Sequence, residues 1–297
     1  MISYDDFKKN ELLSKVSTFR LGGPADYCIE ARDIETLIQV LHFCKSNHLD
    51  YFVIGKGSNC LFSDLGFRGL VIINKIDFME VKKNRFRVGA GYSFSLLGSQ
   101  TARLGFSGLE FAAGIPASVG GAVFMNAGAN GKEVCESLES VEYVSNDGDV
   151  RVFEKDELTF GYRKSSFQEM RGVIVAATFK LEECKLARGR QLEIIQYRKK
   201  TQPLNEPSAG CVFQNPKGQK EESCLSAGKL IEMSELKGIS LGGVKVSEKH
   251  ANFIVNTGSG SAQDVLRLVQ LIKSQVKEKM GIELREEIRL IGEKIEF

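Results

Sequence analysis

The sequence predicts an α+β protein with more than one domain. Apolar residues recur with both the two-residue period of strands and the 3.6-residue period of helices. Val141–Ser145 and Asp149–Phe153 flank the turn Asn146-Asp147-Gly148, a pattern typical of a hairpin. A chain of 297 residues can bury a sizeable core, and we expect two or three domains. The stretch Thr201–Ser208, which contains two prolines, predicts a loop into a further domain.

The N-terminal part carries a predicted βαβ unit. Asp33 is suited to cap a helix whose apolar face runs from Ile34 to Leu41. The flanking strands are expected at Tyr27–Ala31 and Tyr51–Ile54. Further elements follow in order: strands at Leu70–Asn74 and Phe86–Val88, a helix from Ser93 to Leu104, a buried strand at Gly172–Leu181, and a helix ending at Lys200.

The C-terminal part carries strong helix signals. Ser261 and Asp264 stand at the spacing of a capping box. Apolar residues then form one face from Val265 onward, and Gly281 predicts the end of the helix. Alternation over Ile282–Ile291 predicts a final strand.

Charge and cysteine content exclude several classes of protein. The net charge is +2, from 40 Lys+Arg and 38 Asp+Glu, which gives no general attraction to DNA or anionic membranes. Met1–Lys15 lacks the apolar core of a signal peptide, and Val173–Ala177 is too short to span a bilayer. The seven cysteines include no CxxC pair, so we expect neither a zinc site nor a disulfide framework. We therefore expect a cytoplasmic protein that has no metal site.

A long run of small residues, Gly108–Gly131, is the most informative feature of the chain. No charge follows Glu110 within it, and its glycines weaken any helix or strand. Glycines permit close approach of the main chain to a ligand, with N–H groups pointing toward it. A buried, tightly turned core segment is the alternative interpretation. A membrane span is disfavoured because the glycines, a proline and two asparagines of this segment make a poor hydrocarbon-facing helix.

A second glycine-rich loop, Gly55–Asn59, follows a predicted strand. The sequence contains neither GxGxxG nor GxxxxGK[ST], so a nucleotide site of Rossmann or Walker type is not expected. Two such loops far apart in the sequence favour a long dinucleotide. FAD is favoured over ATP because no residues for Mg²⁺-phosphate chemistry accompany the loops.

Eight motifs occur in order along nearly the whole chain. They are Ser17–Ala25, Gly55–Asn59, Gly108–Gly131, Gly161–Phe167, Ser208–Pro216, Ala227–Ile231, Val246–Phe253 and Glu287–Gly292. In these motifs the chain resembles the UDP-N-acetylenolpyruvoylglucosamine reductase family, flavoenzymes of bacterial peptidoglycan precursor synthesis. The short spacing from Arg163 to Cys211 resembles the family's shorter type, which lacks a tyrosine-bearing loop over the substrate.

The resemblance implies a fold and a reaction. The fold would be a two-lobed FAD-binding domain of the vanillyl-alcohol-oxidase type (1–183, lobes 1–75 and 76–183), followed by a C-terminal α+β substrate domain (184–297). The reaction would be NADPH-dependent, FAD-mediated reduction of UDP-N-acetylglucosamine enolpyruvate to UDP-N-acetylmuramate. Hydride would pass from flavin N5 to C3, and a proton would be added at C2. Such an oxidoreductase serves cell wall biogenesis, and through it cell shape and cell division.

Three residues are the catalytic candidates that the resemblance implies. Arg163 would stabilise the enolate formed after hydride transfer, because a guanidinium suits a carboxylate on which charge builds up. Glu287 would be its acidic partner, and we expect it to be protonated, since a bare carboxylate repels an enolate. Cys211 would protonate C2 and stands where much of the family has serine. Without the motifs, a surface arginine, a solvated glutamate and a buried cysteine are the alternatives.

The remaining matched positions are candidate binding residues. For the cofactor they are Gly55, Lys56, Gly57, Ser58, Asn59, Gly114, Ile115, Pro116, Ser118, Gly120, Gly121, Asn126, Ala127 and Ile174. For the substrate they are Tyr162, Asn215, Lys229, His250 and Asn252, although Lys229 could be merely solvated and His250 merely structural.

Two other functions compete with this one. Another FAD-dependent oxidoreductase of the same fold could act on an alcohol or hydroxy acid, but neither glycine-rich loop has a histidine for covalent flavin attachment. We therefore expect non-covalent FAD, with NADPH as reductant. A non-enzymatic flavin- or nucleotide-binding module is disfavoured by the three catalytic candidates. No nucleic acid, membrane or obligate protein partner is expected.

Overall fold

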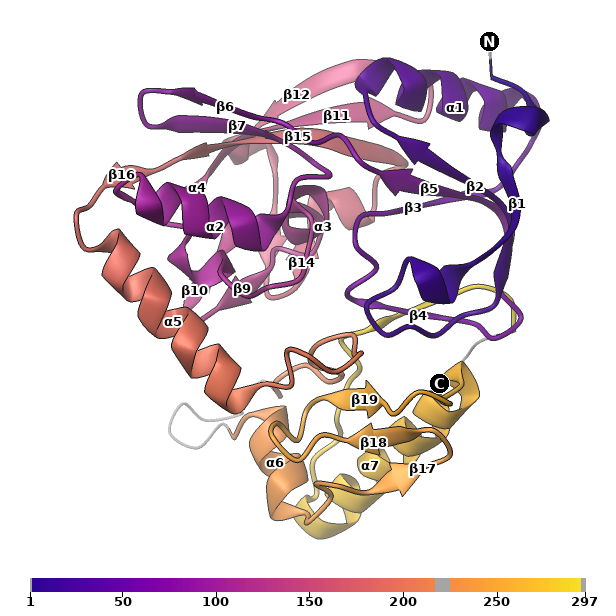
Figure 1. Ribbon diagram of the computed structural model, residues 1–297, viewed down its shortest axis with the longest axis vertical. Helices are drawn as coiled ribbons and strands as arrows, with labels where there is room; N and C mark the ends of the chain where they lie inside the picture. The colour runs from indigo at the N-terminus through magenta and orange to yellow at the C-terminus, as the bar shows by residue number, and fades with distance from the viewer. Residues whose placement is uncertain (1, 217–224, 295–297) are drawn as a thin grey trace. The chain divides into compact units, whose positions relative to one another are not determined.

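The computed structural model describes residues 2–216 and 225–294 (Figure 1). The chain forms two compact units. The first consists of residues up to Lys9, Tyr27–Lys56 and Gly69–Tyr197; the second consists of Asn10–Asp26, Gly57–Arg68 and residues from Arg198 onward. Two short N-terminal segments thus group with the C-terminal part, which differs from a continuous division at 183/184. The predicted domain limits stay a prediction.

A four-stranded sheet contains the predicted βαβ elements, with helix α1 between β2 and β3 in the chain. The Asp33 carboxylate accepts a hydrogen bond from the Thr36 N–H at 2.7 Å and caps α1 as predicted. The bounds, in sheet order, are β1 (Lys8–Leu12), β2 (Pro24–Ala31), β5 (Phe67–Asn74) and β3 (Tyr51–Ile54), with α1 at Ile34–Ser46. Strand β5 lies between β2 and β3 and pairs in parallel with β3.

A five-stranded antiparallel sheet is the centre of the first unit. Its order is β12 (Val150–Glu154), β11 (Leu138–Ser145), β15 (Gly172–Lys180), β7 (Arg85–Gly89) and β6 (Met79–Lys82). The predicted hairpin is confirmed by the pairing of β11 with β12. Val175 and Ile174 of β15 belong to different hydrophobic clusters, so this strand is buried on both faces. Burial on both faces explains its continuous apolar sequence.

Helices cover one face of this sheet, as Figure 1 shows for α2 (Phe94–Arg103) and α3 (Val119–Phe124). Their side chains share one buried cluster with β7, β11 and β15. Other elements of the chain are α4 (Val134–Ser137), α5 (Ala187–Thr201), β4 (Cys60–Phe62), β8 (Phe106–Ser107), β9 (Gly128–Ala129), β10 (Lys132–Glu133), β13 (Phe160–Gly161), β14 (Lys164–Ser165) and β16 (Glu182–Glu183). Single 3-10 turns occur at Tyr4–Asp6, Leu13–Lys15, Glu110–Ala112, Lys155–Glu157 and Ser166–Gln168.

The second unit packs helices against a small antiparallel sheet. The sheet consists of β17 (Ser240–Leu241), β18 (Val244–Val246) and β19 (Ile254–Asn256), and the helices are α6 (Ala227–Met233) and α7 (Ala262–Met280). Both predicted ends of α7 are confirmed: Ser261 and Asp264 form the capping box, and Gly281 takes a left-handed φ of 69°.

The predicted strand over Ile282–Ile291 is wrong for most of its length. Only β20 (Arg289–Ile291) is a strand, and it pairs in parallel with β4. The alternation has another cause, because Leu284 and Ile288 are buried in the core of the second unit without continuous strand pairing. Apolar alternation reports which side chains are buried and does not by itself supply a neighbouring strand.

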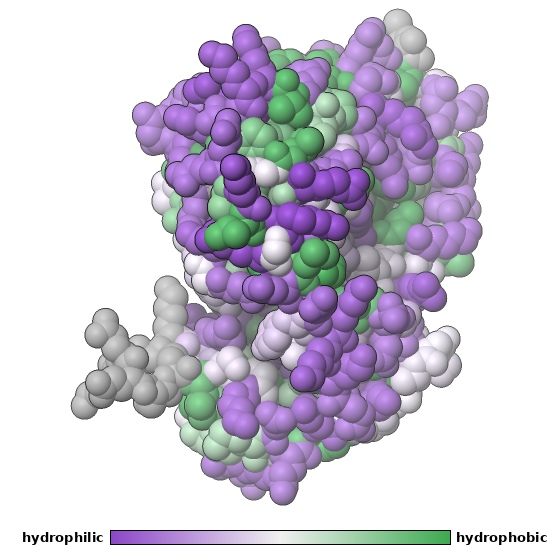
Figure 2. Space-filling model, turned by 60° about the vertical axis from the view of Figure 1, so that its left-hand side comes forward, coloured by the Kyte–Doolittle hydropathy of each residue, from purple (hydrophilic) through white to green (hydrophobic). Residues whose placement is uncertain are grey.

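The outer surface is mostly polar where Figure 2 shows it, with small green hydrophobic areas separated by purple hydrophilic side chains. Among the described residues, every helix is either too short or too polar to cross a bilayer. The same part of the chain contains no cluster of three His, Cys, Asp or Glu residues that could hold a metal ion.

Candidate functional site

The glycine-rich segment uses its own amides to pack within the first unit. The Gly120 N–H donates to the Ala90 carbonyl at 2.8 Å, and the Gly121 N–H donates to Ser118 Oγ at 3.2 Å. The Gly114 N–H likewise donates to a serine hydroxyl at 2.7 Å. For these three amides, the prediction of a free N–H group that points at a ligand is therefore wrong, and contact of the three residues with the cofactor stays a prediction. Glycine is needed for close packing instead, because a Cβ at Gly120 would lie 2.8 Å from the Cβ of Ala90.

The accessible part of this segment is uncharged. Pro116 and Gly121 are exposed, and Gly114, Ile115 and Ala127 are half-buried. This surface consists of uncharged main chain and short or apolar side chains, which suits the ring system of a flavin. A Cβ at Gly121 would lie 3.2 Å from Ser118 Oγ, a close contact with the cap of its own helix. Ile174 lies on the buried strand β15 and is 6% exposed.

Gly55 packs against the start of α3, so the two glycine-rich motifs meet in the first unit. A Cβ at Gly55 would lie 1.9 Å from Ser118 Oγ. The next residue, Lys56, donates to Ser93 Oγ at 2.8 Å at the start of α2. Partial burial, and secondarily the nearby Lys75, lower the pKa of Lys56. No local signal in the sequence indicates this contact between the loop and Ser93.

We expect Gly55→Ala to destabilise the first unit and to lower its FAD content. The added methyl displaces Ser118 Oγ, which caps α3, so the clash and the lost cap together cost about 2 kcal/mol or more. Thermal unfolding and bound flavin per chain measure the effect. The control is Gly189→Ala in α5, where no atom lies within 4 Å and alanine favours the helix. Equal flavin content and melting temperature in both variants would contradict the prediction.

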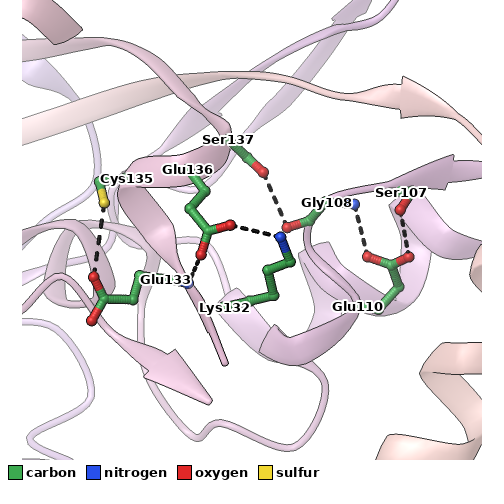
Figure 3. Close-up of polar contacts among 8 residues, drawn as sticks. All are labelled: Ser107, Gly108, Glu110, Lys132, Glu133, Cys135, Glu136 and Ser137. Carbon is green, nitrogen blue, oxygen red and sulfur yellow. Dashed lines mark hydrogen bonds and ion pairs between the residues drawn. The ribbon is translucent and has the colours of Figure 1, made fainter. Parts of the chain in front are cut away.

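Asn126 has a structural role at the end of α3. Its side chain is completely buried and donates to a carboxylate oxygen of Glu133 at 2.9 Å and to the Gly161 carbonyl at 3.0 Å. The side-chain oxygen of Asn126 accepts a hydrogen bond from the Cys135 N–H at 3.1 Å. Figure 3 shows Glu133, with its contact to Cys135 Sγ at 4.0 Å. These bonds account for Asn126 without a ligand, and its predicted contact with the cofactor stays a prediction.

The one acidic residue in the glycine-rich motif is also structural. The Glu110 carboxylate accepts hydrogen bonds from Ser107 Oγ at 2.8 Å and from the Gly108 N–H at 2.7 Å, and Ser137 Oγ donates to the Gly108 carbonyl (Figure 3). Because Glu110 is 8% exposed and its carboxylate accepts two hydrogen bonds, it fixes the turn that begins the motif.

Arg163 is held in a fixed position in the first unit. It occupies the turn between β13 and β14 with a left-handed φ of 56°, which is uncommon for a side chain of this size. Its guanidinium lies 4.7 Å from the ring centroid of Tyr162 and donates to the Gly128 carbonyl at 3.2 Å. The Gln168 side chain donates to the Arg163 carbonyl at 3.0 Å. Uncommon backbone angles persist where surrounding contacts impose them, and they cluster at functional sites.

In the second unit, the main chain of Glu287 lies next to the loop that carries Cys211. The Glu287 N–H donates to the Val212 carbonyl at 2.7 Å. Cys211 itself pairs with Phe253 in an isolated antiparallel bridge. The Asn59 side chain donates to the Glu287 carbonyl at 3.2 Å. Hydrogen bonds thus join three distant motifs next to one another, and each motif carries a predicted site residue: Asn59, Cys211 or Glu287. Arg163 belongs to the other unit.

Asn252 and His250 support this loop. The Asn252 side chain accepts from the Phe213 N–H at 2.9 Å and donates to the Phe213 carbonyl at 2.8 Å. The Asn252 N–H donates to His250 Nδ1 at 3.2 Å, so that nitrogen carries no proton. Asn252 is 4% exposed, and the bonds show that it positions the chain after Cys211. Substrate contact by either residue stays a prediction.

Two further substrate candidates, Asn215 and Lys229, contact or belong to the first turns of α6. The Asn215 side-chain oxygen accepts from the Ala227 N–H at 3.0 Å and so helps to begin the helix. Lys229 is an exposed residue of α6 that pairs with Glu232 at 3.3 Å. An exposed pair of this kind contributes little stability.

Burial makes His250 a pH-sensitive residue of the second unit. The pKa of His250 is lowered, mainly by burial and further by the nearby Lys237. In the unfolded chain histidine has a pKa of about 6.5, so the unfolded state binds more protons below that pH. We therefore expect stability to be lost as the pH falls from about 7 to 5, and less so in His250→Gln. Melting temperature against pH measures this, with the exposed His48→Asn as control. Parallel curves for His250→Gln and the wild type would contradict it.

Comparison with known proteins identifies the family. Residues 202–291 match the family model described as UDP-N-acetylenolpyruvoylglucosamine reductase, C-terminal domain, and residues 25–154 match an FAD binding domain. A UDP-N-acetylenolpyruvoylglucosamine reductase of Protochlamydia amoebophila is 53% identical over 288 residues, which cover 97% of this chain and 94% of the relative. The chain belongs to the UDP-N-acetylenolpyruvoylglucosamine reductase family.

Other members of the UDP-N-acetylenolpyruvoylglucosamine reductase family agree over the full length. The reductase of Chlamydia felis is 45% identical, over 94% of this chain and 92% of the relative. The reductase from Thermus caldophilus, known from its crystal structure, is 38% identical and has a TM-score of 0.80. The match covers 96% of this chain and 99% of the Thermus chain. These findings confirm the predicted family, its α+β fold with an FAD-binding domain, and FAD as cofactor.

Proposed function

We propose that this chain reduces the enolpyruvyl ether of UDP-N-acetylglucosamine to UDP-N-acetylmuramate, with NADPH as reductant. The observation that carries the proposal is 53% identity to a reductase of this name over 97% of the chain. The product belongs to peptidoglycan precursor synthesis. Another oxidoreductase of the same fold, acting on an alcohol or hydroxy acid, is disfavoured because it would not require the C-terminal family match at 202–291.

The glycine-rich surface of the first unit would hold FAD. Gly114, Ile115, Pro116 and Gly121 would contact it through their uncharged accessible surface, and Gly55 shapes the adjoining turn. When bound, FAD supplies the two-electron chemistry that connects NADPH to the substrate double bond. Neither glycine-rich loop contains histidine, so the flavin would be held without a covalent bond.

Arg163 would stabilise the negative charge that develops on the substrate. Reduction of the double bond at C3 leaves an enolate conjugated to the substrate carboxylate. A guanidinium that already occupies a fixed position stabilises this charge without reorganising at the moment of reaction. The stacking of Arg163 on Tyr162 and its bond to the Gly128 carbonyl support that role.

Cys211 would donate its S–H proton to C2 of the enolate and would be left as a thiolate. A thiol has a pKa of about 8.5, so it is a far stronger acid than a serine hydroxyl. Glu287, in its protonated form, would support the same enolate. The Glu287 N–H donates to the carbonyl of Val212, the residue after Cys211. This bond supports the proposal that Cys211 and Glu287 act on the same substrate. If Glu287→Gln showed the wild-type pH–rate profile, a titrating Glu287 would be excluded.

The visible spectrum of the purified protein tests the proposed function. We expect a yellow flavoprotein that is bleached by NADPH and recovers its colour when the enolpyruvyl sugar nucleotide is added. Denaturation should release the flavin into the supernatant. A protein that NADPH bleaches but the sugar nucleotide does not reoxidise would overturn the proposed substrate. Oxidation of an alcohol or hydroxy acid would instead support the competing function.

A further inference from the structure

A half-buried ion pair connects α7 to the residue before Glu287. Lys273 Nζ lies 2.5 Å from a carboxylate oxygen of Glu286, and the two side chains are 31% and 17% exposed. A second pair on the same helix, Lys277 with Glu283 at 2.6 Å, is 64% and 73% exposed. Water screens the Lys277 pair far more, so the Lys273 pair is expected to hold its partners more firmly.

The main chain of Glu286 is also anchored. Glu286 stands opposite Phe213 in an isolated antiparallel bridge, and the Gln214 side chain donates to its carbonyl at 3.2 Å. The next N–H, that of Glu287, donates to the Val212 carbonyl. Phe213 is 1% exposed, so this contact lies against the core of the second unit. Glu286 is therefore bonded through both its side chain and its main chain.

Helix α7 is a firm support for this contact. It has a side-chain cap at Ser261 and a left-handed glycine at its end. Val269, Ile272 and Val276, which surround Lys273 in the helix, are buried in the core. Lys273 therefore reaches Glu286 from a helix whose position the core determines.

Glu286 lies outside the regular strand β20, but its antiparallel bridge with Phe213 makes the chain locally extended, and consecutive side chains of an extended chain point to opposite sides. A rotation of the chain that moves the Glu286 side chain must therefore move the Glu287 side chain in the opposite sense. We propose that Lys273 is a positioning residue: by holding Glu286 against α7, it sets the direction in which Glu287 meets the substrate. The inference rests on the proposed function for the reaction that Glu287 serves.

The test compares Lys273→Met with Lys277→Met, which removes the exposed pair from the same helix. Stopped-flow measurement separates flavin reduction by NADPH from reoxidation by the enolpyruvyl sugar nucleotide. In Lys273→Met we expect reoxidation to slow about tenfold or more, because small displacements of catalytic groups have effects of this size. Flavin reduction should stay unchanged, and Lys273→Arg should restore much of the loss. Glu286→Gln should show the same defect, without further loss in the double variant.

Several outcomes would overturn the inference. Unchanged reoxidation in Lys273→Met would do so, as would equal losses in Lys273→Met and Lys277→Met. Equal slowing of both half-reactions with a lower melting temperature would show a structural role alone. A wild-type protein that the sugar nucleotide does not reoxidise would overturn the proposed function instead. Amide exchange at residues 285–287 then decides the inference: faster exchange in Lys273→Met than in Lys277→Met supports it, and equal exchange overturns it.

Discussion

Replacing Cys211 by alanine is expected to slow reduction of the sugar nucleotide by about 10²–10⁴-fold, the usual contribution of a positioned proton donor. Flavin reduction by NADPH should be retained, because protonation of C2 belongs to the second half-reaction. Cys211→Ser should keep appreciable turnover, since a hydroxyl in the same place can still donate a proton. Stopped-flow absorbance of the flavin measures both half-reactions.

A second cysteine variant separates this role from general loss of a thiol. Cys135 is partly buried, and burial raises its pKa, so Cys135→Ala should leave the rates close to those of the wild type. Alkylation should inactivate the wild type and leave Cys211→Ser largely active. Full activity in Cys211→Ala would remove Cys211 from the mechanism.

Replacing Arg163 by methionine is expected to reduce kcat by about 10²–10³-fold, the range measured when one preorganised donor to a developing charge is lost. Arg163→Lys should recover only part of this, because an ammonium group does not reproduce the planar fork of donors. The stacking on Tyr162 and the bond to the Gly128 carbonyl are both lost in Arg163→Met. Steady-state kinetics with the sugar nucleotide measure the effect.

The control for Arg163 is Arg151→Met in the same unit. Arg151 is exposed and forms a surface ion pair with Glu157 at 2.8 Å, so its loss should change kcat little. If Arg163→Met retained wild-type kcat while flavin content stayed full, Arg163 would not stabilise the transition state. A rise in KM with kcat unchanged would instead point to substrate binding in the ground state.

Local signals in the sequence predicted the elements whose ends are determined by nearby residues. The start of α1 at Asp33 and both ends of α7 follow from caps, which depend on residues within one turn of the helix. The hairpin of β11 and β12 follows from its turn for the same reason.

Long-range partners could not be predicted in this way. Alternation over Ile282–Ile291 identified buried Leu284 and Ile288, but pairing depends on a neighbouring strand, which the segment meets only at β20. The amides of Gly120 and Gly121 were expected to face a ligand, and instead they bond to Ala90 and Ser118. A glycine indicates close approach without indicating what approaches.

The sequence by itself determined the family, the presence of an FAD-binding domain and the chemical types of the candidate site residues, because motifs and side-chain chemistry can be read locally. Only the tertiary structure decided what those residues contact: that Asn252 and Asn126 are structural anchors, that Glu287 lies beside the Cys211 loop, and that Glu286 is held by α7. The physical reason is that most of these contacts join residues distant in the chain, such as Asn126 with Gly161 and Asn252 with Phe213, and their meeting depends on how the core packs.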